Sequence, residues 1–137
     1  MTIPEQVVAK MMSKDAFSKW MGLDILGVGE GWCKLQFIVK PEMLNGFSII
    51  HGGALFAASD SAFAFACNSH GRISLALDVS ITFTKSAKEG DLLTVDAKEL
   101  HLGNKTSVYQ ITTTNEAGEI LALFKGTAYR TSKEVLE

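Results

Sequence analysis

One aspartate lies in the middle of the most apolar segment of the chain. The segment Ala54–Ser69 is rich in Ala and Phe, and Asp60 carries its only charge. The residues at helical spacing around this carboxylate are all apolar, namely Phe56, Ala57, Phe63 and Ala64. An unpaired buried carboxylate is costly, so stability alone does not place one there. The pattern favours a partly desolvated carboxylate with a raised pKa that acts as nucleophile or base; a backbone cap or a pair with a distant Arg is the alternative.

The sequence His51-Gly52-Gly53 stands directly before this segment, where we expect a helix to begin. Free N–H groups at a helix N-terminus point outward in a positive field, and glycine lets another molecule approach the backbone closely. Main chain alone can form an oxyanion hole in this way, although a plain tight turn explains the glycines more simply. Asn45, in the preceding loop, can donate to a carbonyl or fix the loop. His51 can orient Asn45, act as an acid or base, or have a structural role.

Other chemistries find little support in the sequence. The chain has three histidines, which are His51, His70 and His101. Their spacing does not suggest a metal site, and the last two look incidental beside a helix end and a turn. Cys33 and Cys67 form no C-x-x-C motif. The glycines of Gly27–Gly31 open no helix, so they indicate a hairpin turn rather than a nucleotide site. We therefore expect neither a metal nor a cofactor.

Composition narrows the class of protein further. The 137 residues are 47% hydrophobic and 20% charged, which suits a single globular domain over residues 1–137. The net charge is −2 with scattered Lys and Arg, which argues against a nucleic-acid partner. The longest apolar run, near Ala54–Cys67, is too short to span a bilayer and contains Asp60, so we expect no membrane association. The N-terminus does not resemble a signal peptide, and we expect a cytoplasmic protein.

Hydrophobic periodicity predicts the elements around the long helix. An N-terminal helical segment over residues 1–21 contains amphipathic helices at 4–12 and 15–21, and period-two alternation follows over Leu23–Val39. Four strand-like runs come after the helix, namely Ile73–Thr84, Asp91–Leu100, Thr106–Asn115 and Glu119–Arg130. Their connections are too short for parallel crossovers, so the sheet is antiparallel. The sequence predicts an α+β domain with one sheet around one central helix.

The motifs together resemble a known family. Asn45-Gly46, then His51-Gly52-Gly53-Ala-Leu-Phe, then Asp60, are similar to the hot-dog thioesterases, and Asp60–Ser69 and Ala122–Gly126 look most like the PaaI-like branch named for phenylacetate degradation. The resemblance covers roughly residues 15–130. It implies the hot-dog fold, an antiparallel sheet wrapped around one long helix, and subunits that pair into dimers and often tetramers. It also implies hydrolysis of an acyl-CoA.

The resemblance also implies roles for individual residues. The Gly52 N–H would polarise the thioester carbonyl with help from Asn45, and His51 would hold their loop. Asp60 would attack the carbonyl or activate water. Some relatives use a Ser or Thr in the strand after the helix to position water, but Ala76 stands near that place, so Ser74 or Ser80 would be needed instead.

The acyl group is left open by these motifs. The branch suggests phenylacetyl-CoA or another aryl or medium-chain acyl-CoA. Aromatic residues of the helix, Phe56, Phe63 and Phe65, can line a pocket or belong to the core. Gly53 lets substrate approach the helix start, and Lys85 and Lys88 can meet CoA phosphates or remain solvated. Two other functions stay possible, a hot-dog acyl-CoA hydratase or dehydratase and a non-catalytic acyl-CoA-binding protein.

The spacing of the two catalytic candidates predicts a shared site. Gly52 and Asp60 are eight residues apart, which separates them by roughly 12 Å along one helix. A reacting carbonyl has to lie about 3 Å from both its oxyanion donor and its nucleophile. We therefore expect a homodimer in which Asp60 of one chain meets Gly52 of the other. Because one sheet covers only one side of an apolar helix, we also expect no stable monomer.

Overall fold

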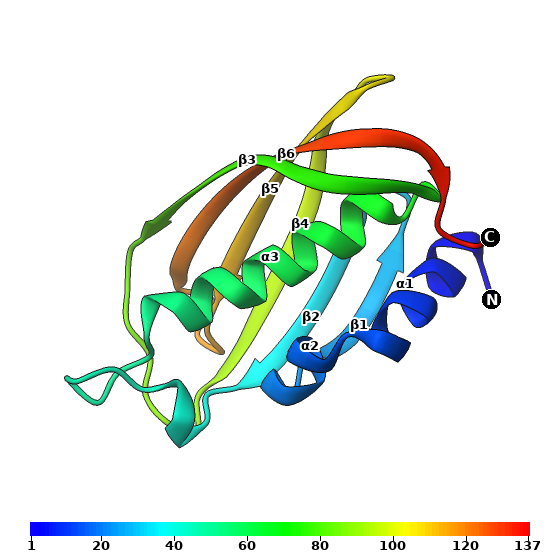
Figure 1. The fold of residues 1–137 in the computed structure, drawn as a ribbon. Helices are drawn as coiled ribbons and strands as arrows, with labels where there is room; N and C mark the ends of the chain where they lie inside the picture. Colours follow the sequence, from blue (N-terminus) through cyan, green and yellow to red (C-terminus); the bar gives the residue numbers. More distant parts are fainter.

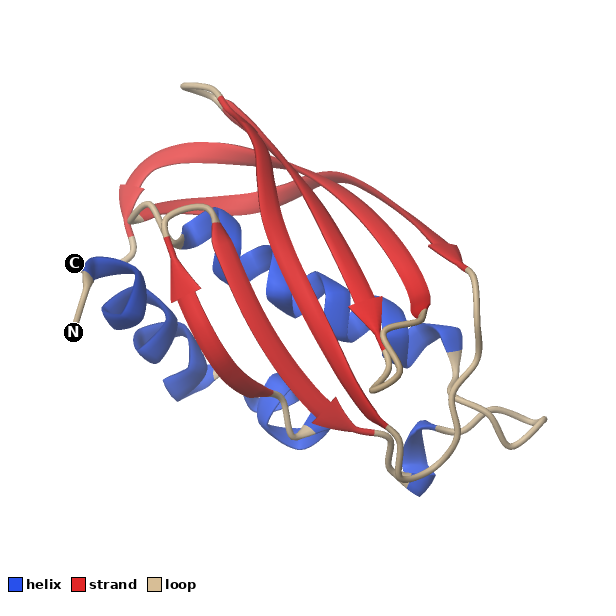
Figure 2. Cartoon of the chain, turned by 180° about the vertical axis from the view of Figure 1, so that it is seen from behind, coloured by secondary structure: helices blue, strands red, loops and turns tan.

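The long apolar helix lies across the inner face of a single curved sheet. A computed structural model describes residues 1–137 (Figures 1 and 2). The elements in chain order are α1 (Ile3–Lys14), α2 (Ala16–Met21), β1 (Asp24–Gly29), β2 (Trp32–Ile38), η1 (Pro41–Met43), α3 (Gly52–Asn68), β3 (Arg72–Phe83), β4 (Leu92–Leu102), β5 (Thr106–Thr114) and β6 (Ile120–Glu134). The six strands pair antiparallel in the order β1-β2-β4-β5-β6-β3, which confirms the predicted hot-dog fold.

The ends of the elements differ from the predicted bounds for local reasons. The long helix begins at Gly52, two residues early, because His51 caps it. The first helix begins at Ile3 because Thr2 and Glu5 form a capping box. The last strand runs on to Glu134 because it keeps pairing with the start of β3 at Arg72. None of the helices is both long enough and apolar enough to cross a lipid bilayer.

The core forms between α3 and the sheet. Along β2, Leu35 and Phe37 are buried while Lys34 and Ile38 are exposed, as the alternation predicts. Phe63 of α3 is fully buried and contacts the sheet closely. Its ring lies 5.7 Å from that of Tyr109 and 5.9 Å from that of Phe124, centroid to centroid. A Cβ at Gly126 would lie 2.7 Å from the Phe63 ring, so this close approach requires glycine on β6. Phe65 is also buried.

The N-terminal helices cover a second side of α3. Figure 1 shows α1 and α2 beside α3, on the side away from β3. The Ser18 and Ser61 hydroxyl oxygens lie 2.9 Å apart and join α2 to α3. The Lys10 ammonium donates to the carbonyls of Val135 and Glu137, which holds the C-terminus beside α1. Between these helices and the edge strand β3, one strip of α3 stays partly uncovered.

We predict that Phe63 acts in stability and not as a pocket wall. Phe63→Ala should lower the free energy of unfolding by about 3–5 kcal/mol, because it leaves a cavity in a close-packed core. The control Phe17→Ala removes a ring that is 52% exposed, and should cost less than about 1 kcal/mol. Urea denaturation measures both values. Equal losses for the two variants would contradict the assignment of Phe63 to the core.

Candidate active site

The loop before α3 is held in shape by Asn45. Its side-chain oxygen accepts hydrogen bonds from the backbone N–H groups of Phe47 at 2.8 Å and Ile49 at 3.4 Å. Its backbone N–H donates to the Ile49 carbonyl at 2.8 Å. Asn45 thus fixes the loop through its oxygen, while its side-chain N–H₂ group donates to nothing in the chain. That amide is therefore free to donate to a ligand.

His51 caps the helix that follows. Its Nδ1 accepts a hydrogen bond from the Gly53 N–H at 2.7 Å, so the neutral ring carries its proton on Nε2. Its own N–H donates to the Met43 carbonyl at 2.8 Å, which fastens the end of the loop. No hydrogen bond joins His51 to Asn45. The ring holds the start of α3, rather than orienting Asn45 directly.

Gly52 presents a free donor at the positive end of α3. It is the first residue of the helix, and its N–H donates to no acceptor in the chain. The Phe83 ring lies 3.1 Å from where a Cβ of Gly52 would stand, so a side chain here would press on the ring of Phe83 from β3. A cavity of about 360 Å³ opens at this point and is lined by Gly52, Phe83 and Lys85 among others. The arrangement can bind an oxygen that develops negative charge.

Asp60 stands two turns further along the helix without a partner in the chain. It is half-buried, and this burial raises the pKa of its carboxyl group above the ordinary value. No hydrogen bond or ion pair of the chain involves it, so neither the backbone cap nor the Arg pair is seen. Its neighbours differ, because Ser59 donates to the Leu55 carbonyl and Ser61 contacts Ser18. A partly desolvated, unpaired carboxylate of this kind is suited to nucleophilic or basic chemistry.

The fold brings only some of the other candidates to the cavity. Lys85 lines it and pairs with Glu119 at 3.2 Å, with both side chains about half exposed. Lys88 is exposed further along the loop and does not line it. Phe56 is partly exposed and packs edge-on against Phe124. Phe63 reaches no surface, in agreement with the core alternative.

The structure of β3 does not single out a serine that would position water. Ala76 is exposed there and offers no donor. The Ser74 hydroxyl is buried and already donates to the Arg72 carbonyl at 3.1 Å. Ser80 is exposed on the same strand and makes no side-chain hydrogen bond in the chain.

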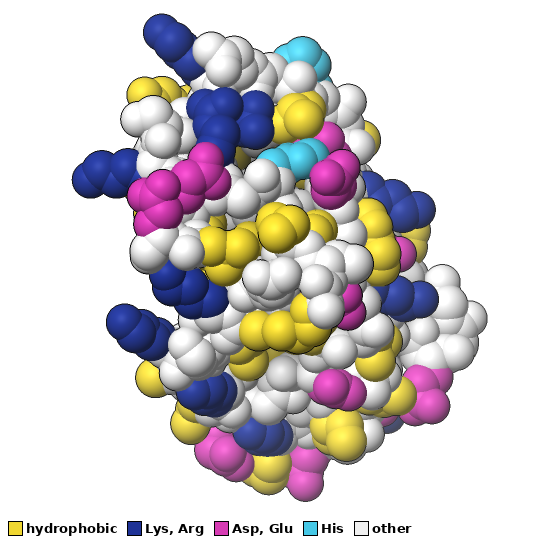
Figure 3. Space-filling model, turned by 90° about the vertical axis from the view of Figure 1, so that its right-hand side faces the viewer, with side chains coloured by type: hydrophobic (Ala, Val, Ile, Leu, Met, Phe, Trp, Pro, Cys, Tyr) yellow, Lys and Arg dark blue, Asp and Glu magenta, His cyan; other side chains and the backbone are white.

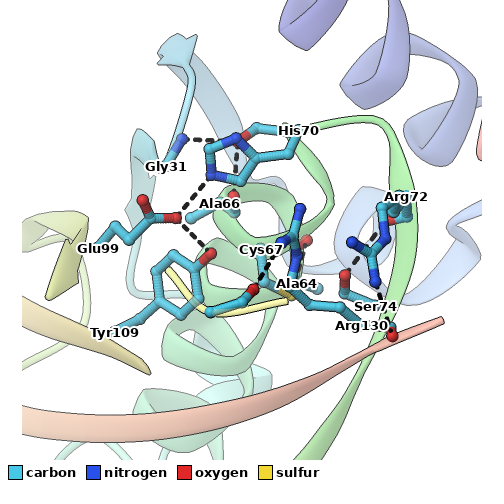
Figure 4. A network of polar contacts seen from close by, with 12 residues as sticks. Gly31, Ala64, Ala66, Cys67, His70, Arg72, Ser74, Glu99, Tyr109 and Arg130 are labelled. Atoms are coloured by element: carbon cyan, nitrogen blue, oxygen red, sulfur yellow. Dashed lines mark hydrogen bonds and ion pairs between the residues drawn. The ribbon is translucent and has the colours of Figure 1, made fainter. Parts of the chain in front are cut away.

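A polar cluster at the other end of α3 has no counterpart in the sequence analysis, where His70 looks incidental. The Nε2 of His70 lies 2.7 Å from a Glu99 carboxylate oxygen, and the Tyr109 hydroxyl donates to the same oxygen at 2.7 Å (Figure 4). Burial raises the pKa of Tyr109, so its hydroxyl stays protonated. Ser69 also accepts a hydrogen bond from the Gly31 N–H at 2.8 Å. These contacts fasten the end of α3 to the sheet, and residues so far apart in the chain carry no local signal.

Acidic and basic side chains are interspersed on the surface. On the face in Figure 3, basic side chains lie among acidic and apolar ones. Of the shifted carboxyl groups, Glu5 and Glu119 have lowered pKa values, the first because of Thr2 and the second because of Asn115 and Lys85. Asp60 differs from these two, because burial raises the pKa of its carboxyl group. Its environment therefore differs from that of Glu5 and Glu119, which are exposed.

Proteins of a known family are similar in sequence to this chain. Residues 47–122 match the family model described as the thioesterase superfamily. A putative esterase of Archaeoglobus fulgidus is 43% identical over 130 residues, which cover 95% of this chain and 84% of that protein. The acyl-coenzyme A thioesterase PaaI of Escherichia coli is 40% identical over 120 residues, with coverage of 88% and 86%.

Solved structures of similar proteins have the same fold as this chain. The E. coli PaaI protein, from the phenylacetic acid degradation operon, superposes with a TM-score of 0.94 at 37% identity and covers 96% of both chains. A Streptococcus mutans protein bound to acetyl-CoA superposes with a TM-score of 0.79 at 29% identity, covering 82% of this chain and 90% of its own. The fold and the site thus define a thioester hydrolase. This chain belongs to the thioesterase superfamily and is a PaaI-like hot-dog thioesterase, which confirms the resemblance.

The raised pKa of Asp60 makes stability depend on pH. The unfolded carboxyl has a pKa near the ordinary 3.8, and the folded one keeps its proton to higher pH. Above that value the folded state binds more protons than the unfolded state. The free energy of unfolding therefore decreases as pH rises through this range. Asp60→Asn has no such proton to lose. Its melting temperature relative to wild type should therefore increase from pH 4 towards neutrality.

The control for this measurement is Glu116→Gln, which removes an exposed carboxylate in the β5–β6 turn. Its melting temperature should follow the wild-type value at each pH. A difference between Asp60→Asn and wild type that stays constant across the range would show that burial does not disfavour the Asp60 carboxylate.

Proposed function

We propose that this chain hydrolyses acyl-CoA thioesters at a site shared by two copies of the chain. The observation that carries the proposal is the pair of unsatisfied groups on α3, the free Gly52 N–H and the unpaired Asp60 carboxylate. One is suited to a developing oxyanion, and the other to attack or base catalysis. The relationship to E. coli PaaI, an acyl-coenzyme A thioesterase, supports the same reaction.

The chemistry requires little beyond these groups. The thioester carbonyl oxygen accepts from the Gly52 N–H, and the free Asn45 amide adds a second donor. The Asp60 carboxylate either attacks the carbonyl carbon or takes a proton from water that does so. In the first case the C–S bond breaks, the CoA thiolate leaves, and water hydrolyses the acyl-enzyme anhydride to free acid. In the second case the water oxygen bonds to the carbonyl carbon, the C–S bond breaks, and the CoA thiolate leaves with the proton that Asp60 took, so the free acid forms without an acyl-enzyme.

Two copies are needed because α3 is rigid. Gly52 and Asp60 are separated by roughly 12 Å along the helix, too far to reach one carbonyl. A two-fold axis that sets two α3 helices antiparallel brings Asp60 of one copy towards Gly52 of the other. The uncovered strip of α3 supports such pairing, because Gly53 and Ala57 on it are small. The unpaired edge of β3 beside it, with Leu77 61% exposed, offers further surface.

Larger assembly belongs to the same proposal. Exposed apolar side chains of the sheet, Ile38, Leu100 and Leu102, support the association of two dimers into a tetramer. A cytoplasmic location is also proposed, supported by two buried cysteines, Cys33 and Cys67, that form no disulfide.

The CoA portion is proposed to occupy the cavity beside Gly52. Lys85 at its wall can exchange its exposed pairing with Glu119 for a CoA phosphate. Lys88 remains a second candidate further along the loop. Gly53, without a side chain, leaves room at the helix start. The acyl group is proposed to be aryl or medium-chain, with the partly exposed Phe56 near the reacting carbonyl.

The direct test is neutralisation of the carboxylate. Asp60→Asn should lower turnover of phenylacetyl-CoA or hexanoyl-CoA by at least about 100-fold, because the nucleophile or base is lost while the shape is kept. A thiol reagent measures CoA release, and thermal melting reports the fold. Glu116→Gln serves as the control and should retain wild-type turnover. An active, folded Asn variant would rule out this mechanism.

Mixed subunits test whether the site is shared. Asn45→Ala and Asp60→Asn should each be nearly inactive alone. In a mixed dimer one site receives both lesions and the other receives neither. Random pairing makes about half of the dimers mixed, so roughly a quarter of all sites should be intact after joint refolding. Activity should recover towards that fraction. A mixture as inactive as its parents, with subunit exchange proven by mass-tagged chains, would place both groups of a site in one chain.

A further inference from the structure

A second cavity lies on the other side of Asp60 from the Gly52 cavity of the same chain. It measures about 400 Å³ and runs between α1, the second half of α3 and the start of β3. Its apolar wall contains Met11 from α1, Ala64 from α3, and Ile73 and Leu75 from β3. We call it the α1 groove. Nothing in the catalytic arrangement described above uses it.

The α1 groove begins next to the proposed nucleophile. Ala64 follows Asp60 by one helical turn, and residues four apart lie on the same face of a helix, about 6 Å along its axis. Both side chains belong to the partly uncovered strip of α3. The groove therefore begins within one helical turn of an acyl carbon held at Asp60. In the proposed dimer, the cavity beside Gly52 of the partner subunit lies on the other side of that carbonyl, where the CoA portion is proposed to bind.

The buried polar groups that border the groove are already hydrogen-bonded, and the remaining polar side chain, Lys14, is exposed to solvent. The Asn68 amide donates to the carbonyls of Ala64 at 2.9 Å and Ser74 at 3.1 Å, and its oxygen accepts from the Ser74 N–H at 2.8 Å. Lys10 is tied to carbonyls of the C-terminal residues. An apolar ligand can therefore enter without leaving a buried donor or acceptor unpaired, which would otherwise cost binding.

The size of the groove fits a ring or a medium chain. A closed apolar cavity of about 150 Å³ holds benzene, and the α1 groove exceeds that volume while being open along one side. The C-terminus pinned to Lys10 borders it, and Met11 narrows it from the α1 side. A short acyl group such as acetyl would leave most of it empty.

We propose that the α1 groove binds the acyl group of the substrate, and that Met11 and Ala64 set the largest acyl group accepted. The inference rests on the proposed thioesterase function and on the role of Asp60. On this proposal the two sides of the reacting carbonyl bind different parts of the substrate. The Lys85 side takes the phosphate-bearing CoA, and the α1 side takes the apolar acyl group.

The chain offers a matched control. Met11 and Met12 are adjacent on α1, and both are partly buried against the core. Met11 lines the α1 groove, whereas Met12 lines a separate depression against Ile25 and Val28 of β1. Substitutions at the two positions alter the same helix, but only those at Met11 alter the groove.

The experiment measures kcat/KM for acetyl-, hexanoyl-, decanoyl- and phenylacetyl-CoA by thiol release, with acetyl-CoA as internal reference. Met11→Trp and Ala64→Leu fill the groove, and should lower the phenylacetyl-to-acetyl and hexanoyl-to-acetyl ratios by about 10-fold or more. Met11→Ala enlarges it, and should raise the decanoyl-to-hexanoyl ratio. Met12→Trp and Met12→Ala should leave all ratios within about two-fold of wild type, a margin well below the effect of one misplaced methylene.

The outcomes separate the inference from the function on which it rests. Unchanged ratios in both Met11 variants, or equal changes in the Met12 variants, would overturn the acyl assignment while hydrolysis itself stands. A wild-type chain that releases CoA from none of the esters would overturn the thioesterase function and the inference together. Because Met11 lies on α1, its variants decide the matter even if Ala64→Leu fails to assemble.

Discussion

The need to cover one apolar helix shapes this molecule. α3 carries apolar side chains on nearly every face, and such a helix is unstable unless most of them leave water. The six strands curl around it, and the buried side chains of α3 and the sheet form one continuous core. The N-terminal helices α1 and α2 cover another side (Figure 1). What remains is a narrow strip, and Asp60 lies on it.

The same constraint makes α3 a rigid support for chemistry. Its start is held by the His51 cap, and its end by the bond from the Gly31 N–H to Ser69 and by the Glu99 cluster. Groups on a fixed element need no reorganisation when charge develops, which is how preorganised donors lower a barrier. Rigidity also has a geometric consequence. Gly52 and Asp60, eight residues apart on one straight helix, cannot both contact the same substrate carbonyl, so the proposed site requires a second helix.

The proposed site is divided between the central helix and its periphery. Of the groups proposed for the reaction, Gly52 and Asp60 lie on α3 within the matched thioesterase region, and Asn45 lies two residues before that region. The α1 groove combines that helix with α1, which precedes the matched residues. On the proposed arrangement, changes in α1 alter the accepted acyl group without disturbing the oxyanion donor. The similarity to E. coli PaaI identifies the class of reaction, and the choice of acyl group is proposed to depend on these peripheral contacts.

The sequence by itself determined the features that are local or periodic. A lone Asp60 in an apolar run, glycines at a helix start and period-two strands each have a physical cause within a few residues, so the antiparallel sheet around one helix and most of the proposed site were predictable. Tertiary structure decided what depends on residues distant in the chain. It placed Phe63 against Gly126, directed the Asn45 oxygen back into its own loop, and brought His70 to Glu99 and Tyr109. It also formed the α1 groove from three separate elements, because a cavity exists only where packed surfaces fail to meet, and no local pattern encodes that.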